Sequence, residues 1–258
     1  GYNPYRVTRA GIEWEVPEPH NPWANIGYWN DHQIIYLQKL LEVAEQVQPG
    51  RLAQLWNEPV FSYANVPYRQ KSYAQMLANW YDTIAFDWEV EKAVATAVSH
   101  LGTDGRLLLN PAGEVIHVTM VEKLLVLLLA KLTNLVPEGG IWMNTQRPEW
   151  NDANNALVGK GLSVVTAAYL RRFIAFWKTL LAAYEGADFV VNTAVATVLG
   201  DVQIIFNHFQ DRLDSGFSDA DRRAVMDALG TAVTAYRTTL YESSLPQTQQ
   251  PLAAVELA

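Results

Sequence analysis

The sequence contains no cysteine and no Asn-x-Ser/Thr sequon. The first absence excludes disulfides, thiolate metal sites, iron–sulfur clusters and cysteine nucleophiles. The five histidines never fall at a His-x-x-x-His spacing, which excludes a zinc site of that pattern. We therefore expect no metal and no cofactor. The lack of cysteine also fits a cytoplasmic location.

Long hydrophobic runs and dense basic stretches are missing too. The longest uninterrupted apolar run, Leu124 to Ala130, is far shorter than the ~18–20 residues that cross a bilayer. The formal net charge is −8, and no stripe of Lys and Arg offers the positive surface that a nucleic-acid backbone requires. The sequence therefore predicts a protein that binds neither membranes nor nucleic acid.

Apolar and aromatic residues are abundant. Half of the 258 residues are hydrophobic and 18% are charged, which is typical of a packed globular protein. We expect a single helical domain over residues 1–258. Eight of the nine Trp and ten of the twelve Pro precede residue 160. Residues 1–160 are therefore interpreted as the site-bearing part, and residues 161–258 as a helical scaffold.

Apolar residues recur at helical spacing in six segments. These segments are 34–44, 90–101, 118–135, 162–180, 190–209 and 225–240, and the last two are expected to pack as an antiparallel pair. Asp31, Ser163 and Ser218 stand where N-caps are expected, and Gly102 should end the helix before it. The turn Asn110–Gly113 predicts one small β-hairpin. The predicted fold class is all-α.

Three long segments combine aromatic and polar side chains: Tyr2–Asn30, Asn57–Gln70 and Pro137–Gly161. They are too long and too aromatic to be simple connections, so we expect them to form one concave surface. Aromatic faces stack on sugar rings while amides and carboxylates bond to hydroxyls. The alternative is that these aromatics only pack loops onto helices. The aromatic candidates are Trp23, Tyr28, Trp29, Tyr63, Tyr68, Trp142 and Trp150.

The densest polar cluster leads into the helix predicted at 162–180. It reads Asn144-Thr-Gln-Arg147-Pro-Glu149-Trp150-Asn151-Asp152-Ala-Asn-Asn155. Cleavage of a glycosidic bond needs a protonated carboxylic acid that donates to the leaving oxygen. Asp152 and Glu149 are the candidates for this acid. In the alternative interpretation, Asp152 caps a helix and Glu149 is a surface charge.

The run Pro-Glu-Trp-Asn-Asp-Ala-Asn-Asn, followed by Gly-Lys-Gly-Leu-Ser, resembles a motif of the cellobiose and chitobiose phosphorylases. That motif reads Gly-Asp-Trp-Asn-Asp-Gly-Met-Asn, and its second Asp, which follows Trp-Asn, is the general acid. The resemblance implies that Asp152 has this role.

A second resemblance lies upstream. Gly27-Tyr-Trp-Asn-Asp31-His-Gln33 is similar to the family's Gly-Phe-Arg-Asp-x-x-Gln-Asp segment, whose Arg and Asp hold the sugar. Asp31 matches the Asp, but Asn30 replaces the Arg, and His32 or Arg69 is a candidate substitute for the lost cation. The family has an (α/α)6 toroid of twelve helices. Because about seven or eight helices are predicted here, the resemblance implies an incomplete toroid, or a fragment of a large bacterial member.

The sequence thus predicts a carbohydrate-active enzyme, or a fragment of one, that cleaves a glycosidic bond by inverting hydrolysis or phosphorolysis. Its partner would be an oligosaccharide or disaccharide, joined in phosphorolysis by inorganic phosphate, for which Arg69, Arg147 and His117 are candidate ligands. The alternative is a catalytically silent sugar-binding or scaffold domain. The residues expected to bind the substrate are Trp29, Asp31, His32, Gln33, Arg69, Arg147, Trp150, Asn151 and Asn155.

Overall fold

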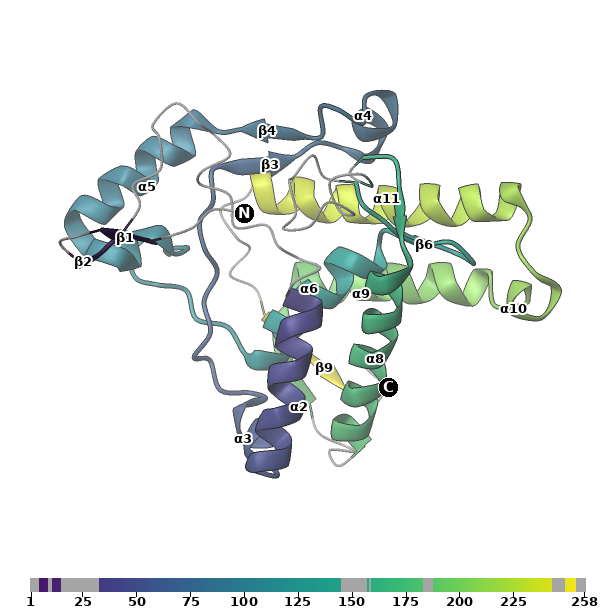
Figure 1. Ribbon diagram of the computed structural model, residues 1–258, viewed down its shortest axis with the longest axis horizontal. Helices are drawn as coiled ribbons and strands as arrows, with labels where there is room; N and C mark the ends of the chain where they lie inside the picture. Colours follow the sequence, from purple (N-terminus) through teal and green to yellow (C-terminus); the bar gives the residue numbers. More distant parts are fainter. Residues whose placement is uncertain are drawn as a thin grey trace.

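The computed structural model describes residues 5–8, 11–14, 33–144, 157, 159–182, 188–242 and 249–253. These residues are mostly helical with a few short strands, so the predicted helical class is confirmed (Figure 1). The α-helices are α2 (Gln38–Val47), α3 (Arg51–Leu55), α4 (Tyr73–Ala78), α5 (Trp88–Leu101), α6 (Met120–Leu132), α8 (Val164–Leu181), α9 (Thr193–His208), α10 (Arg212–Ser215) and α11 (Asp219–Glu242). A π-helix, η2 (Gln33–Leu37), runs into α2, and a 3-10 helix, η3 (Gly102–Arg106), follows α5.

The strands form small antiparallel sheets rather than one large one. The pairs are β1 (Tyr5–Thr8) with β2 (Gly11–Trp14), β3 (Tyr68–Gln70) with β4 (Ile84–Phe86), and β8 (Asp188–Asn192) with β9 (Gln249–Ala253). A three-stranded sheet joins β5 (Leu135–Val136), β6 (Gly140–Trp142) and β7 (Leu162–Ser163). In the β3–β4 pair, Arg69 stands opposite Ala85, which fixes the backbone of Arg69.

Helix α6 lies at the centre of the core. It contacts η2, α8, α9 and β8, so its apolar residues are covered from several sides. The main cluster of buried residues extends along the sequence from Ile34 to Leu252. Side chains from both sides of the compositional change near residue 160 therefore share one core. The buried residues of α6 are Met120, Val121, Glu122, Leu124, Leu125, Leu127, Leu129 and Lys131.

Several predicted helix ends are confirmed. The Ser163 hydroxyl accepts a hydrogen bond from the Thr166 N–H at the start of α8. Ser218 and Asp221 cap α11 reciprocally, because the Asp221 N–H donates to the Ser218 hydroxyl and the Ser218 N–H to the Asp221 carboxylate. Helix α5 ends at Gly102, whose positive φ of 64° disfavours other residues. The predicted cap Asp31 lies outside the described residues.

The helix predicted at 190–209 begins later than expected. Residues 188–192 form β8, and α9 starts at Thr193, where the Asn192 side chain accepts a hydrogen bond from the Ala194 N–H. The period of Val190 fits a helix, but pairing with β9 overrides it, because Val190 stands opposite Pro251 in the ladder. The predicted hairpin does form: the Ile116 N–H donates to the Leu108 carbonyl at 2.9 Å.

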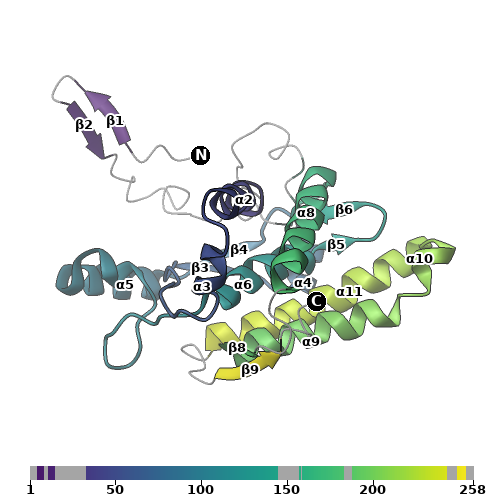
Figure 2. The same cartoon turned by 90° about the horizontal axis from the view of Figure 1, so that it is seen from below.

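Helices α9 and α11 lie side by side and run antiparallel, as predicted, with α10 in the turn between them (Figures 1 and 2). Helix α5 stands apart from α2 and α8, at the far end of the β3–β4 pair (Figure 1). None of its residues is fully buried. Within the described residues, no helix combines the length and apolar character needed to cross a membrane.

Candidate functional site

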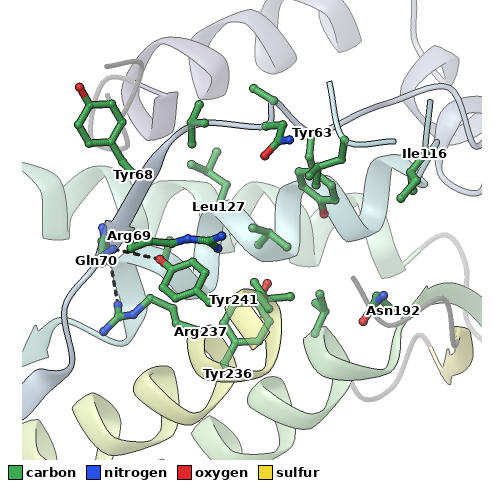
Figure 3. Close-up of a pocket in the computed structure, with 18 of the residues that line it drawn as sticks. Tyr63, Tyr68, Arg69, Gln70, Ile116, Leu127, Asn192, Tyr236, Arg237 and Tyr241 are labelled. Carbon is green, nitrogen blue, oxygen red and sulfur yellow. Dashed lines mark hydrogen bonds between the residues drawn. The ribbon is translucent and has the colours of Figure 1, made fainter. Parts of the chain in front are cut away.

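A cavity of about 790 Å³ opens between the β3 region, α5, α6 and the C-terminal half of α11 (Figure 3). This volume falls in the range of ~300–1,000 Å³ typical of ligand pockets. The apolar side chains Val90, Val94 and Ala97 of α5 line one wall. The cavity explains why α5 has an apolar face but no buried residue, since that face is turned towards a hollow.

The rest of the wall is aromatic and polar. Tyrosines and amides come from the β3 region, the end of α6, the start of α9 and α11. They are Tyr63, Asn65, Tyr68, Gln70, Asn134, Asn144, Asn192, Tyr236 and Tyr241. The charged lining residues are Arg69, Glu122, Lys123, Lys131 and Arg237.

Glu122 is a buried carboxyl in the first turn of α6, with only 2% of the residue exposed. One oxygen accepts a hydrogen bond from the Tyr63 hydroxyl at 3.1 Å, and the other accepts one from the Asn192 N–H at 2.8 Å. Burial raises the pKa of Glu122 above its ordinary value, although both donors act in the opposite direction. Glu122 therefore ties α6 to the β3 region and to the end of β8.

Lys123, the next residue, lies over the ring of Tyr63. Its ammonium donates to the Ser62 carbonyl at 2.5 Å and lies 4.1 Å from the centre of the Tyr63 ring. Burial lowers the pKa of Lys123, which Glu122 partly opposes. Glu122 therefore contacts the hydroxyl of Tyr63 while Lys123 contacts its ring. Burial also raises the pKa of the Tyr63 phenol well above its ordinary value.

Arg69 projects from β3 across the cavity. Its Nε donates to the Asp87 carboxylate at 3.1 Å, and its guanidinium carbon lies 4.6 Å from the centre of the Tyr241 ring. Asp87 also caps α5 through the Val90 N–H, so a single carboxylate holds both the helix end and the arginine. Figure 3 shows the guanidinium of Arg69 reaching over Tyr241.

Gln70 connects the same strand to α11. Its N–H donates to the Tyr241 hydroxyl at 3.1 Å, and its side-chain oxygen accepts a hydrogen bond from Arg237 at 2.8 Å (Figure 3). Arg237 also donates to the Lys71 carbonyl. These bonds fix the ring on which Arg69 rests, so the position of Arg69 depends on β3, α5 and α11 together.

Of the substrate-binding residues predicted from sequence, Arg69 lines the cavity. Gln33 is the first residue of η2. The other predicted residues lie outside the described part of the chain, and so do both candidate acids. They are Trp29, Asp31, His32, Arg147, Glu149, Trp150, Asn151, Asp152 and Asn155.

Of the aromatic candidates, Trp23 and Tyr28 also lie outside the described residues, and those within them divide in two. Tyr63 and Tyr68 line the cavity. Trp142 is buried instead: it packs edge-on against Tyr73, and its indole N–H donates to the Gly159 carbonyl at 3.2 Å. For Trp142 the alternative of loop packing is therefore the right one. His117, a candidate phosphate ligand, is exposed and is not among the residues that line the cavity.

Sequence reasoning missed Glu122, Lys123 and Arg237. A signal for the first was present, because Glu122 falls four residues after Val118 and three before Leu125 on the apolar face of the predicted helix. A charge on a buried face needs a partner or a function. Arg237 had no such signal, because it follows Tyr236 on a helix with many other charges.

The fold and the cavity define a mostly helical protein with a polar and aromatic hollow of ligand size. In the described ranges no group of three or more His, Asp and Glu side chains is close enough to hold a metal ion. No model of a known protein family matches the chain, and a search of curated proteins finds no match either.

Proposed function

We propose that the cavity binds a carbohydrate, and that the chain is an enzyme, or part of one, that cleaves a glycosidic bond. The observation that carries this proposal is the composition of the cavity wall. Tyr63, Tyr68 and Tyr241 supply aromatic rings, while Asn65 and Asn144 supply amides. Rings and planar amides together satisfy the apolar faces and the hydroxyls of a sugar.

The proposed chemistry rests on Asp152 as general acid, with Glu149 as second candidate. Asn144 supports this, because it lines the cavity and lies only a few residues before both in the sequence. The acid protonates the leaving oxygen, and either water or inorganic phosphate attacks the sugar. Water needs a second carboxylate ~6.5–9.5 Å from the first. The candidates for this base are Glu13, Glu15, Glu18 and Asp31. The proposal includes an incomplete (α/α)6 toroid as the larger architecture.

One observation favours the alternative, a silent sugar-binding or scaffold domain. Within the described part, Glu122 is the only carboxyl that lines the cavity. Both of its oxygens already accept hydrogen bonds, from Tyr63 and Asn192. A carboxylate held in this way is suited to bracing the wall rather than to transferring a proton to a ligand.

Binding is tested first, by isothermal titration calorimetry with neutral monosaccharides and disaccharides. We expect Asn65→Ala to weaken the binding of the best sugar about tenfold, since a lost hydrogen bond in a closed site is worth ~1–1.5 kcal/mol. Asn207→Ala, an exposed amide on α9 outside the cavity wall, is the matched control and should change nothing. The carbohydrate proposal fails if no sugar binds the wild-type chain.

Catalysis is tested separately with the sugar that binds. Asp152→Asn should abolish release of reducing sugar, with and without phosphate, and leave the affinity for the sugar nearly unchanged. Turnover that persists in Asp152→Asn but is lost in Glu149→Gln would move the acid to Glu149. Sugar binding without turnover by the wild-type chain would favour the silent domain.

A further inference from the structure

Among the described residues, most charged side chains that line the cavity are basic, whereas the chain as a whole is acidic. The protein as a whole has 27 acidic and 19 basic residues. Among the described residues that line the cavity, four are basic, Arg69, Lys123, Lys131 and Arg237, and one is acidic, Glu122. Bases still outnumber acids if Asp87, the partner of Arg69, is added. A hollow with this excess attracts anions.

Arg69 is the base best placed to grip an anion. Within the described part of the chain its hydrogen bond to Asp87 comes from Nε, and its two terminal nitrogens donate to no other protein group. About a third of the side chain is exposed, and Arg69 is one of the residues that line the cavity. Two parallel N–H donors match the two oxygens of a carboxylate or a phosphate.

The surroundings hold Arg69 in a defined position before any ligand arrives. Asp87 fixes its Nε, and the Tyr241 ring supports its flat face. The Tyr241 hydroxyl is fixed in turn by the Gln70 N–H. A guanidinium that is already ordered loses little conformational entropy on binding, which raises its affinity for an anion.

We propose that the cavity takes an anionic ligand, whose carboxylate or phosphate group is bound by the terminal nitrogens of Arg69. Arg237 and Lys123 add attraction from the same wall. This inference deepens the proposed function, and it rests on that function where it assigns the anion to a sugar. The group comes either from an acidic sugar or from inorganic phosphate bound beside a neutral sugar, since both present the same oxyanion.

Calorimetric titration of the wild-type chain with four probes separates these sources: glucose, glucuronate, glucose 6-phosphate and inorganic phosphate. We expect at least one anionic probe to bind about tenfold tighter than glucose, and its affinity to fall as sodium chloride is raised. Tight glucuronate or glucose 6-phosphate without tight phosphate identifies an acidic sugar. Tight phosphate identifies a separate anion.

Arg69→Gln should reduce the affinity for the anionic probe about tenfold or more, and by a clearly larger factor than it reduces the affinity for glucose. The matched control is Arg172→Gln, which also breaks one arginine–carboxylate pair, with Glu42, but lies outside the cavity wall. Arg69→Lys keeps the charge and loses the paired donors, so an intermediate loss is expected. Should Arg69→Gln fail to fold, the inference is tested by the affinities of the wild-type chain for the four probes and by Arg69→Lys.

The inference is overturned if no anionic probe binds better than glucose. It is also overturned if Arg69→Gln and the wild type bind the anionic probe with equal affinity. If neutral sugars bind and anions gain nothing, the carbohydrate proposal stands and this inference is wrong. If inorganic phosphate binds through Arg69 and no sugar binds, the anion site stands and the carbohydrate proposal is wrong. If none of the four probes binds, this inference is wrong, and the carbohydrate proposal is wrong as well if the neutral disaccharides also fail to bind.

Discussion

The carboxylate of Glu122 accepts a hydrogen bond from the N–H of Asn192, the last residue of β8, which is 70 positions later in the sequence. The distance is 2.8 Å, and the other carboxylate oxygen accepts from Tyr63. These two bonds hold three separate segments around one side of the cavity. They also compensate for the burial of a charged group, which would otherwise be strongly unfavourable.

Replacement of Glu122 by an apolar residue should be costly. Glu122→Leu leaves the Asn192 N–H and the Tyr63 hydroxyl without their acceptor, so we expect the free energy of unfolding to fall by about 2–4 kcal/mol. Glu122→Gln keeps an acceptor for Asn192 and should cost less than half as much. Urea unfolding followed by circular dichroism measures both, with exposed Glu58→Leu as control. Equal stability of the Leu and Gln variants would contradict the role assigned to these bonds.

The raised pKa of Glu122 predicts a pH dependence with a definite sign. The folded state holds this proton more tightly than the unfolded state, whose pKa is near the ordinary 4.5. As the pH rises above about 4.5, the wild type should therefore lose stability relative to Glu122→Gln, until the folded pKa is passed. Unfolding curves of both proteins at a series of pH values measure the difference. A difference that grows in the opposite direction would show that the two hydrogen bonds outweigh burial.

Asp87 should behave in the opposite way. The Val90 N–H, and after it the Arg69 guanidinium, lower the pKa of Asp87 below the ordinary 3.8. Its ionised form therefore contributes stability above about pH 3.8, and this contribution is lost as the pH falls through the folded pKa. Asp87→Asn can still cap α5, so we expect a loss of only about 0.5–1 kcal/mol at neutral pH. The loss should vanish in strong acid; a constant difference across the pH range would exclude the charge as its cause.

The contact between α4 and α11 requires a glycine. A β-carbon on Gly230 would lie 2.3 Å from the Tyr73 ring, and the Tyr73 hydroxyl is held by the Asp227 carboxylate at 2.6 Å. Gly230→Ala should therefore lower stability by about 1–3 kcal/mol despite the better helix propensity of Ala. Gly200 lies inside α9 with open space around it, so Gly200→Ala should raise stability by about 0.5–1 kcal/mol. The two melting temperatures should move in opposite directions, and a parallel shift would contradict the packing explanation.

Helices and strands that depend on neighbouring residues could be predicted from the sequence. Those that depend on a partner far along the chain could not. Helices α6 and α8 follow from apolar spacing and from their capping residues, which are local. The strand β8 does not, because Val190 fits the helical period equally well and only its partner β9, late in the chain, decides the matter. The other small sheets were missed for a second reason, because most of their strands are too short to show an alternating pattern.

The residues of the candidate site, too, could be predicted from the sequence only in part. Tyr63 was predicted from the aromatic and polar composition of one long loop. Arg69 was predicted as a substitute for the arginine of the phosphorylase motif or as a phosphate ligand, and both residues line the cavity. Trp142 satisfied the same criterion and is buried. Composition cannot distinguish a ring that faces a hollow from one that faces the core, because that depends on what packs against it.

The sequence by itself determined the helical class, the position of most long helices and the presence of aromatic loops with polar side chains. These features arise from residues that are near one another along the chain. Only the tertiary structure decided that Arg69, Lys123 and Arg237 share one wall, and that Glu122 is held between Tyr63 and Asn192. The charge of the cavity is set by residues from separate elements, so it emerges only when β3, α6 and α11 are brought together.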